Sequence, residues 1–221
     1  MLQPNARTTK ILKKSCFIAA LFVSICIVFP ACRNHTPAQE PDLCDSTLWR
    51  EGDLVLRCGW GMESRAVTTN SQSAYSHTGI LHYDSRTSNW QVVHAVPGED
   101  KPEYVKAEPV ALFFSHERAR SGAWLRVDCS DSIARQAAAY AIEKVEQKVE
   151  FDNNYLLSDT TMLYCTELIW LSYCKAGIDI SGGARQSVPT LFCKEGECIF
   201  PANIEQSKST LFIKSLKTKS L

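Results

Sequence analysis

The sequence has no excess of either charge and no internal repeat. Its 24 Lys and Arg residues equal its 24 Asp and Glu residues. A balanced chain makes no overall field that attracts nucleic acid, so a nucleic-acid partner is not predicted. With 45% hydrophobic and 22% charged residues, the composition is that of a globular protein rather than a disordered one. A length of 221 residues, less a targeting segment, fits one domain.

The sequence also lacks an apolar run long enough for a comfortable transmembrane helix, which needs about 20 residues. Its most apolar stretch, residues 16–29, contains one polar residue, Ser24. Four basic residues precede this stretch: Arg7, Lys10, Lys13 and Lys14. A basic start before a short apolar run is typical of a secretory signal, so we predict export from the cytoplasm.

The signal ends in Phe29-Pro30-Ala31-Cys32. This resembles a bacterial lipobox, in which a small residue precedes a cysteine that is lipidated and becomes the new N-terminus. Ala31 and Cys32 fit, whereas Phe29 stands where an aliphatic residue is usual. The resemblance implies a signal peptide over residues 1–31, then a lipidated Cys32 and a polar tether over residues 32–47. Simple cleavage and an uncleaved anchor are the alternatives.

A pair of close cysteines suited to a zinc site occurs once only. Three of the ten cysteines belong to the signal, and among the others Cys193 and Cys198 are separated by four residues. An extracytoplasmic location would allow these two to close a small disulfide loop. Zinc would need a second ligand pair, and no other close Cys/Cys or Cys/His pair is present. Neither a metal nor another cofactor is predicted.

The chain after the tether has the pattern of one α+β domain. Short apolar or alternating runs predict strands over 53–58, 77–83, 90–96, 122–127 and 210–213, and turn formers at 84–88 make the second and third a hairpin. Apolar residues at helical spacing predict helices from about 133 to 148 and from 165 to 176. The polar segment 61–74 is predicted to be a loop.

Cys165 opens the second predicted helix. A thiol attacks a carbonyl as thiolate, and free N–H groups at a helix N-terminus favour that charge. The same groups, above all the N–H of Cys165, could hold the oxyanion of a tetrahedral intermediate. An inert, buried cysteine is the alternative, because free cysteines are among the most buried residues.

His77 and His94 lie on the two strands of the predicted hairpin. If the turn is centred between residues 85 and 86, these two histidines face each other across the strands and project to one side. One could then act as a base while the other fixes its tautomer. A slip of one residue would separate them, and ordinary core histidines are the alternative. His82 lies on the opposite face.

Several segments, in this order, carry a family resemblance. They are Gly52-Asp53 with its strand, Tyr75-Ser76-His77-Thr78-Gly79-Ile80, Phe151-Asp152, the segment from Tyr164 to Trp170, and Pro201-Ala202-Asn203-Ile204. The chain resembles the permuted papain-like hydrolases related to NlpC/P60 peptidases, and within them most of all the YiiX/YebB-like enzymes. The resemblance implies an α+β fold over residues 48–221, with an antiparallel sheet or small barrel packed against helices. Histidine before cysteine is the order of the permuted group.

The resemblance also implies roles for individual residues. Cys165 would be the nucleophile, His77 the base, and His94 the third polar position, where many similar enzymes have a glutamate. Tyr164 and Glu167 match the segment that flanks the nucleophile and would contact substrate. Packing for Tyr164 and helix charge complementarity for Glu167 are the alternatives.

These expectations describe a cysteine hydrolase in the cell envelope, held at a membrane by its lipid and facing the periplasm or the cell surface. It would cleave an amide or ester bond through an acyl-thioester. The substrate would be a peptidoglycan peptide or an acylated amide or ester. Residues 110–114 are apolar and could line an acyl pocket, or belong to the core. An acyltransferase and a non-catalytic surface binding module remain alternative functions.

Overall fold

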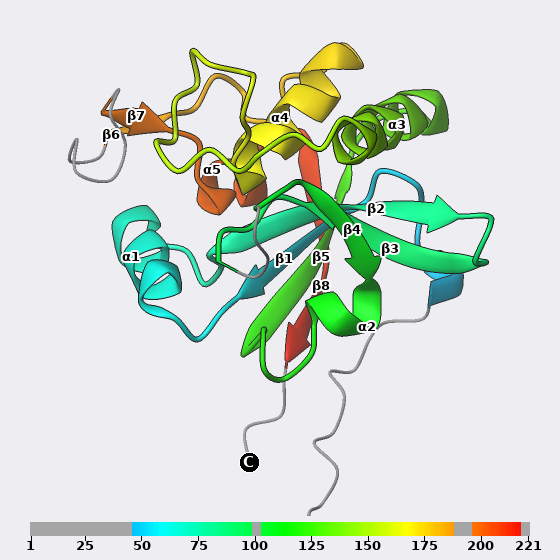
Figure 1. Ribbon diagram of the computed structural model, residues 1–221, viewed down its shortest axis with the longest axis horizontal. Helices are drawn as coiled ribbons and strands as arrows, with labels where there is room; N and C mark the ends of the chain where they lie inside the picture. Colours follow the sequence, from blue (N-terminus) through cyan, green and yellow to red (C-terminus); the bar gives the residue numbers. More distant parts are fainter. Residues whose placement is uncertain (1–45, 99–102, 188–195, 218–221) are drawn as a thin grey trace, which may run out of the picture. The chain divides into compact units, whose positions relative to one another are not determined.

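The computed structural model describes residues 46–98, 103–187 and 196–217, which contain a six-stranded antiparallel sheet (Figure 1). Its strand order is β4-β3-β2-β1-β5-β8. The strands are β1 (Leu54–Cys58), β2 (His77–Asp84), β3 (Asn89–His94), β4 (Lys106–Pro109), β5 (Ser121–Val127) and β8 (Thr210–Lys217). A separate pair is formed by β6 (Gln186–Ser187) and β7 (Glu197–Cys198).

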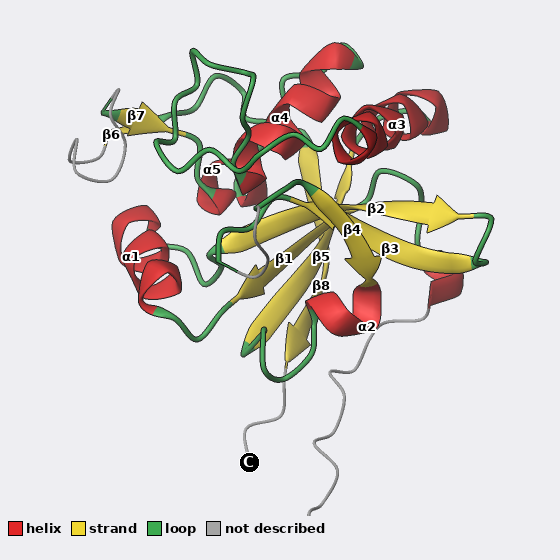
Figure 2. Ribbon diagram, in the orientation of Figure 1, coloured by secondary structure: helices red, strands yellow, loops and turns green. Residues whose placement is uncertain are grey.

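Helices cover both faces of the sheet (Figure 2). The long helices α3 (Asp131–Glu146) and α4 (Cys165–Lys175) pack on one face, and the short α2 (Val110–Phe113) packs on the other. The remaining helices are η1 (Ser46–Leu48), α1 (Met62–Ser71) and α5 (Pro201–Glu205). Alternate residues of β1 serve the two sides, because Leu54 and Leu56 belong to the larger core under α3 and α4, whereas Val55 belongs to the smaller one. The predicted α+β class with an antiparallel sheet against helices is confirmed.

The predicted strands, the hairpin and both predicted helices are present, and their ends have local causes. Ser130 caps α3, its hydroxyl accepting the N–H of Ile133 at 3.4 Å. Gly177 ends the helical segment after α4 with φ of +95°, a conformation that favours glycine. The prediction of a loop over residues 61–74 is wrong, because α1 occupies most of it. Val67 of α1 packs against the larger core, which holds a segment of weak helix formers in place.

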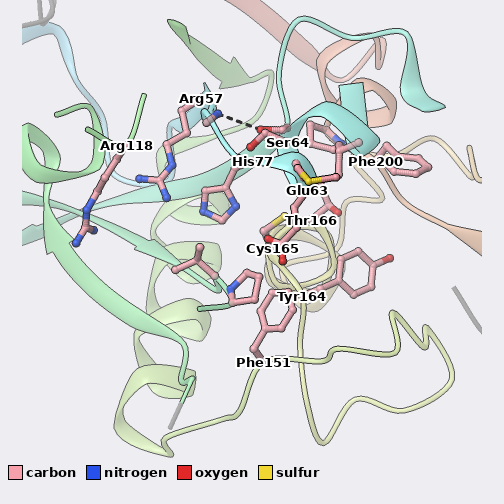
Figure 3. A pocket seen from close by; sticks show the side chains of 18 of the residues that line it. Arg57, Glu63, Ser64, His77, Arg118, Phe151, Tyr164, Cys165, Thr166 and Phe200 are labelled. Carbon is pink, nitrogen blue, oxygen red and sulfur yellow. Dashed lines mark hydrogen bonds between the residues drawn. The ribbon is translucent and has the colours of Figure 1, made fainter. Parts of the chain in front are cut away.

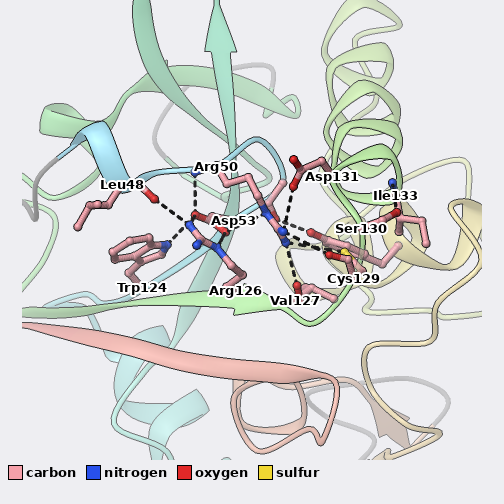
Figure 4. A network of polar contacts seen from close by, with 12 residues as sticks. Leu48, Arg50, Asp53, Trp124, Arg126, Val127, Cys129, Ser130, Asp131 and Ile133 are labelled. Carbon is pink, nitrogen blue, oxygen red and sulfur yellow. Dashed lines mark hydrogen bonds and ion pairs between the residues drawn. The ribbon is translucent and has the colours of Figure 1, made fainter.

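A buried carboxylate joins the start of β1 to β5 (Figure 4). Asp53 is fully buried and accepts four hydrogen bonds: from the backbone N–H of Arg50 at 2.9 Å, Nε1 of Trp124 at 2.9 Å, and Nε and Nη2 of Arg126 at 2.8 and 2.7 Å. The side chain of Arg50 continues the network to the carbonyl of Cys129 at 3.2 Å, just before α3. The network fixes β1, which carries one wall of the site described below.

Several sequence predictions lie outside the described residues. These are the signal, Cys32 and the tether up to residue 45, and Cys193 of the predicted disulfide. Within the described part of the chain, no helix is both long and apolar enough to cross a membrane.

Candidate active site

A cavity of about 570 Å³ opens at one end of the sheet (Figure 3). It is bounded by the end of β1, the start of β2, the first turns of α1 and α4, and the segment that leads into α5. His77 and Cys165 both line it, so the predicted base and the predicted nucleophile share one cleft. Its other walls are largely apolar and include Trp60, Phe151 and Phe200.

Cys165 is the first residue of α4, as predicted. Its thiol receives backbone N–H groups from Thr166 and from Cys165 itself at the helix start, and from Thr78, which follows His77 on β2. The contact with Thr78 ties the sulfur to the strand that carries the histidine. These donors lower the pKa of the thiol, but burial outweighs them and raises the pKa above its ordinary value of 9.0. The resting sulfur is therefore a thiol and not the thiolate that the helix position suggested.

His77 and His94 are in direct contact, as predicted. Nε2 of His77 lies 2.9 Å from Nδ1 of His94, and the two rings meet edge to face with centroids 5.1 Å apart. The register differs from the predicted one, because Ile80 pairs with Val93. Residue 77 is therefore diagonal to residue 94 and on the same face. Gly79 allows the two strands to pack closely here, since a Cβ there would clash with Cγ1 of Val92 and lie 3.3 Å from Cβ of His94.

A glutamate that the sequence analysis did not identify completes the cluster. Glu108 on β4 is buried, and its Oε1 lies 3.1 Å from Nε2 of His94, although the two groups are not aligned as an ideal hydrogen bond. Its Oε2 accepts a hydrogen bond from Nη1 of Arg118 at 2.6 Å and lies 3.5 Å from Nζ of Lys106. Arg57 approaches Oε1 to 4.0 Å. Burial raises the pKa of Glu108, but its contact with His94 and the charges of Lys106 and Arg118 lower it to about 2, so it is ionised at neutral pH.

The two histidines are neutral at neutral pH. Burial, then the charges of Arg57, His94 and Lys106, hold the pKa of His77 well below 6.5. Burial also lowers the pKa of His94, and the neighbouring Glu108 offsets part of this effect. A neutral imidazole with a neutral thiol in the same cavity can take the thiol proton during attack on a carbonyl.

The other predicted residues have different positions. Tyr164 lines the cavity and is almost fully buried, its hydroxyl accepting the N–H of Ile199 at 3.0 Å. Glu167 is fully buried and is not part of the cavity wall, so the structure does not bring it to a substrate. Val110, Phe113 and Phe114 belong to the smaller core and not to the cavity wall, so of the two alternatives for residues 110–114 the structure supports the core segment. Phe113 instead packs on His77 and His94, with ring centroids 5.7 and 5.2 Å away.

The sequence of the domain that carries His77 on β2 and Cys165 on α4 matches a known family. Residues 49–215 match the family described as "Permuted papain-like amidase enzyme, YaeF/YiiX, C92 family". The chain belongs to this amidase family. The amidase is a papain-like cysteine hydrolase by family, and its order of histidine before cysteine is the permuted one.

A solved structure shares the fold of this amidase. The crystal structure of "metalloprotein yiiX" from Escherichia coli O157:H7 superposes with a TM-score of 0.62 at 19% sequence identity. The superposition covers 76% of this chain and 98% of that chain. No sequence among curated proteins matches this chain.

The Escherichia coli protein is called a metalloprotein. Across residues 46–98, 103–187 and 196–217, no three or more His, Cys, Asp or Glu side chains are grouped so that they could hold a metal ion. The described donor set therefore does not fit a metal site, and the steps below run through protein groups alone.

Proposed function

We propose that this amidase is an extracytoplasmic, lipid-anchored enzyme that hydrolyses an amide or ester bond of a substrate with an apolar acyl group. The observation that carries the proposal is the cavity itself, which holds Cys165 and His77 between apolar walls. Trp60 and Met62 at its rim are 52% and 86% exposed, which suits the entry of an amphipathic molecule. The walls also hold charged side chains, Glu63, Glu117 and Arg118 among them, but more of the lining is apolar than polar, which is why we prefer the acyl substrate to a strongly polar cell-wall peptide.

In the first half of the proposed reaction, the sulfur of Cys165 bonds to the substrate carbonyl carbon while the S–H proton passes to Nδ1 of His77. This is the ring nitrogen that His94 does not engage. The backbone N–H of Cys165, which faces its own sulfur at the start of α4 in the resting enzyme, donates to the oxyanion. The carbon–nitrogen or carbon–oxygen bond then breaks, and the leaving group takes the proton from His77.

In the second half, water adds to the thioester carbon and gives a proton to His77. The carbon–sulfur bond breaks, the acid leaves, and the sulfur recovers the proton. If an amine or alcohol took the place of water, the same residues would perform acyl transfer. The retention of nucleophile and base in one cavity argues against a binding module without turnover.

The test is incubation of the purified protein with a panel of N-acyl amides and acyl esters of increasing chain length and, separately, with peptidoglycan fragments. Mass spectrometry of the products would distinguish free acid from transferred acyl groups. We expect hydrolysis that improves with acyl length and is absent with Cys165→Ala. Cleavage of peptidoglycan peptides alone would overturn the acyl preference, and equal results for wild type and Cys165→Ala would overturn the enzymatic proposal.

The location is proposed from the N-terminal sequence. Cys32 would carry the lipid, and the polar tether would hold the domain away from the membrane surface. We expect the wild-type protein to enter the detergent phase on Triton X-114 partition and Cys32→Ser to stay in the aqueous phase. A wild-type protein that partitions like Cys32→Ser would contradict the anchor.

A further inference from the structure

A cluster of charged side chains, Glu108 with Arg118, Lys106 and Arg57, lies next to His94. A nucleophile and its base do not by themselves require such a cluster. Glu108 does not line the cavity. It contacts the ring of His94, which in turn contacts the base, His77. We propose that Glu108 is a positioning residue that sets the tautomers of His94 and His77, so that the nitrogen of His77 without a proton faces the thiol. The inference rests on the proposed role of His77 as base.

The argument follows the proton from ring to ring. Ionised Glu108 can only accept, so its negative charge 3.1 Å from Nε2 of His94 favours a hydrogen on that nitrogen even without ideal hydrogen-bond alignment. A neutral imidazole has one N–H, so Nδ1 of His94 holds a lone pair. Nε2 of His77 is 2.9 Å from that lone pair and must donate to it. Nδ1 of His77 is then left as the lone pair that can accept the proton of Cys165.

Without such an anchor the two rings could reverse together. If Nδ1 of His94 donated instead, Nε2 of His77 would accept, and Nδ1 of His77 would carry a hydrogen. A ring nitrogen that already carries a hydrogen has no lone pair with which to take the proton of the thiol, and the other nitrogen of His77 is engaged with His94. The carboxylate of Glu108, which is separated from the sulfur by the two imidazole rings, therefore decides whether the base can act.

Glu108→Gln is expected to cause this reversal. The oxygen Oε2 faces two donors, Arg118 at 2.6 Å and Lys106 at 3.5 Å, so the amide oxygen of a glutamine would turn to them. Its NH₂ group would then face Nε2 of His94 and convert that nitrogen into an acceptor. Glu108→Asp keeps an acceptor-only group and should keep the wild-type tautomers.

Glu51 offers a matched control. It forms the other described glutamate–histidine contact of the sheet, with Oε1 2.6 Å from Nδ1 of His82, and its Oε2 accepts the N–H of Tyr83 at 2.7 Å. Neither Glu51 nor His82 lines the cavity. Glu51→Gln changes the same chemical group, in the turn before β1, without touching the pair of His77 and His94.

The experiment is ¹⁵N–¹H correlation of the imidazole nitrogens in the full-length protein labelled at histidine, with signals assigned by His77→Gln and His94→Gln. In wild type we expect both rings to be protonated at Nε2, with Nδ1 bare. Glu108→Gln should move the hydrogen of both rings to Nδ1, whereas Glu108→Asp and Glu51→Gln should leave both unchanged. A wild-type His94 protonated at Nδ1 would overturn the proposal even if Glu108→Gln failed to fold.

Turnover of p-nitrophenyl butyrate gives the second readout, with Cys165→Ala as the blank. We expect Glu108→Gln to lower kcat by about 10³- to 10⁴-fold, the loss typical of a base in the wrong tautomer, and to leave KM nearly unchanged. Equal kcat values for Glu108→Gln and Glu51→Gln would refute the positioning role. If wild type shows no turnover above the blank, the proposed function fails, while the tautomers in the spectrum still decide the structural inference.

Discussion

The rate at which Cys165 is alkylated should rise with pH throughout the neutral range. Its pKa lies above 9.0, so fewer than about one in 100 sulfurs is ionised at pH 7. Iodoacetamide reacts with the thiolate, so the rate should increase about tenfold per pH unit from pH 6 to 8.5. Quenched time points, digestion and mass spectrometry would follow the peptide that contains Cys165. Cys174, half-buried at the far end of α4 and also with a raised pKa, is an internal reference.

A resting thiolate–imidazolium pair would behave differently. Its alkylation rate would be flat from about pH 5 to 8 and would exceed that of Cys174 by orders of magnitude at the acid end. That result would refute the neutral pair and the conclusion that burial outweighs the helix N-terminus. It would leave the nucleophile unchanged but would assign a cationic His77 to the resting state, in conflict with the charges of Arg57 and Lys106 around it.

Three further predictions concern turnover and stability. Cys165→Ser should abolish turnover and leave the thermal midpoint nearly unchanged, and retained activity would reassign the nucleophile. Asp53→Ala should lower the free energy of unfolding in urea by about 3–5 kcal/mol, because it strands the partly buried Arg126 and the indole N–H of Trp124; a loss below about 1 kcal/mol would contradict this. His77 has a lower pKa folded than unfolded, so stability is full above pH 6.5 and falls as pH drops below it. His77→Gln should reduce that fall by up to about 1.4 kcal/mol per pH unit, and an unchanged slope would contradict the low pKa of His77.

The hairpin shows what local sequence could predict. The alternation of residues 77–83 and 90–96 and the turn formers between them were enough to place His77 and His94 on one face. In the predicted register residue 94 pairs with residue 77, whereas in the observed register, in which Ile80 pairs with Val93, it falls opposite residue 79. The register is therefore shifted by two residues. A side-chain period of two keeps the same face under such a shift, so the contact survived the error.

Two features of the site depend on tertiary structure and carry no local signal. The helix α1 consists largely of Ser, Thr and other weak helix formers, and its position over the cavity depends on Val67 reaching the core. The raised pKa of Cys165 depends on burial by elements distant in sequence, which opposed the helix effect that the sequence did predict. In both cases, contacts between residues distant in the sequence outweigh the preference of the local sequence.

Glu108 explains how a histidine can occupy a position where similar enzymes were expected to have a glutamate. The carboxylate has not been lost from the cluster; it stands one ring farther from the sulfur, on β4, where Val92 of β3 pairs with it. At that distance, and with Arg118 and Lys106 on its other oxygen, it can orient the base but stabilises an imidazolium less than a direct neighbour would. The pKa of His77 is low because of burial first and of the nearby positive charges of Arg57 and Lys106 second, and burial also keeps the sulfur of Cys165 a thiol at rest. Proton transfer from Cys165 must then accompany attack on the carbonyl instead of preceding it, which makes the tautomer of His77 decisive for this chain.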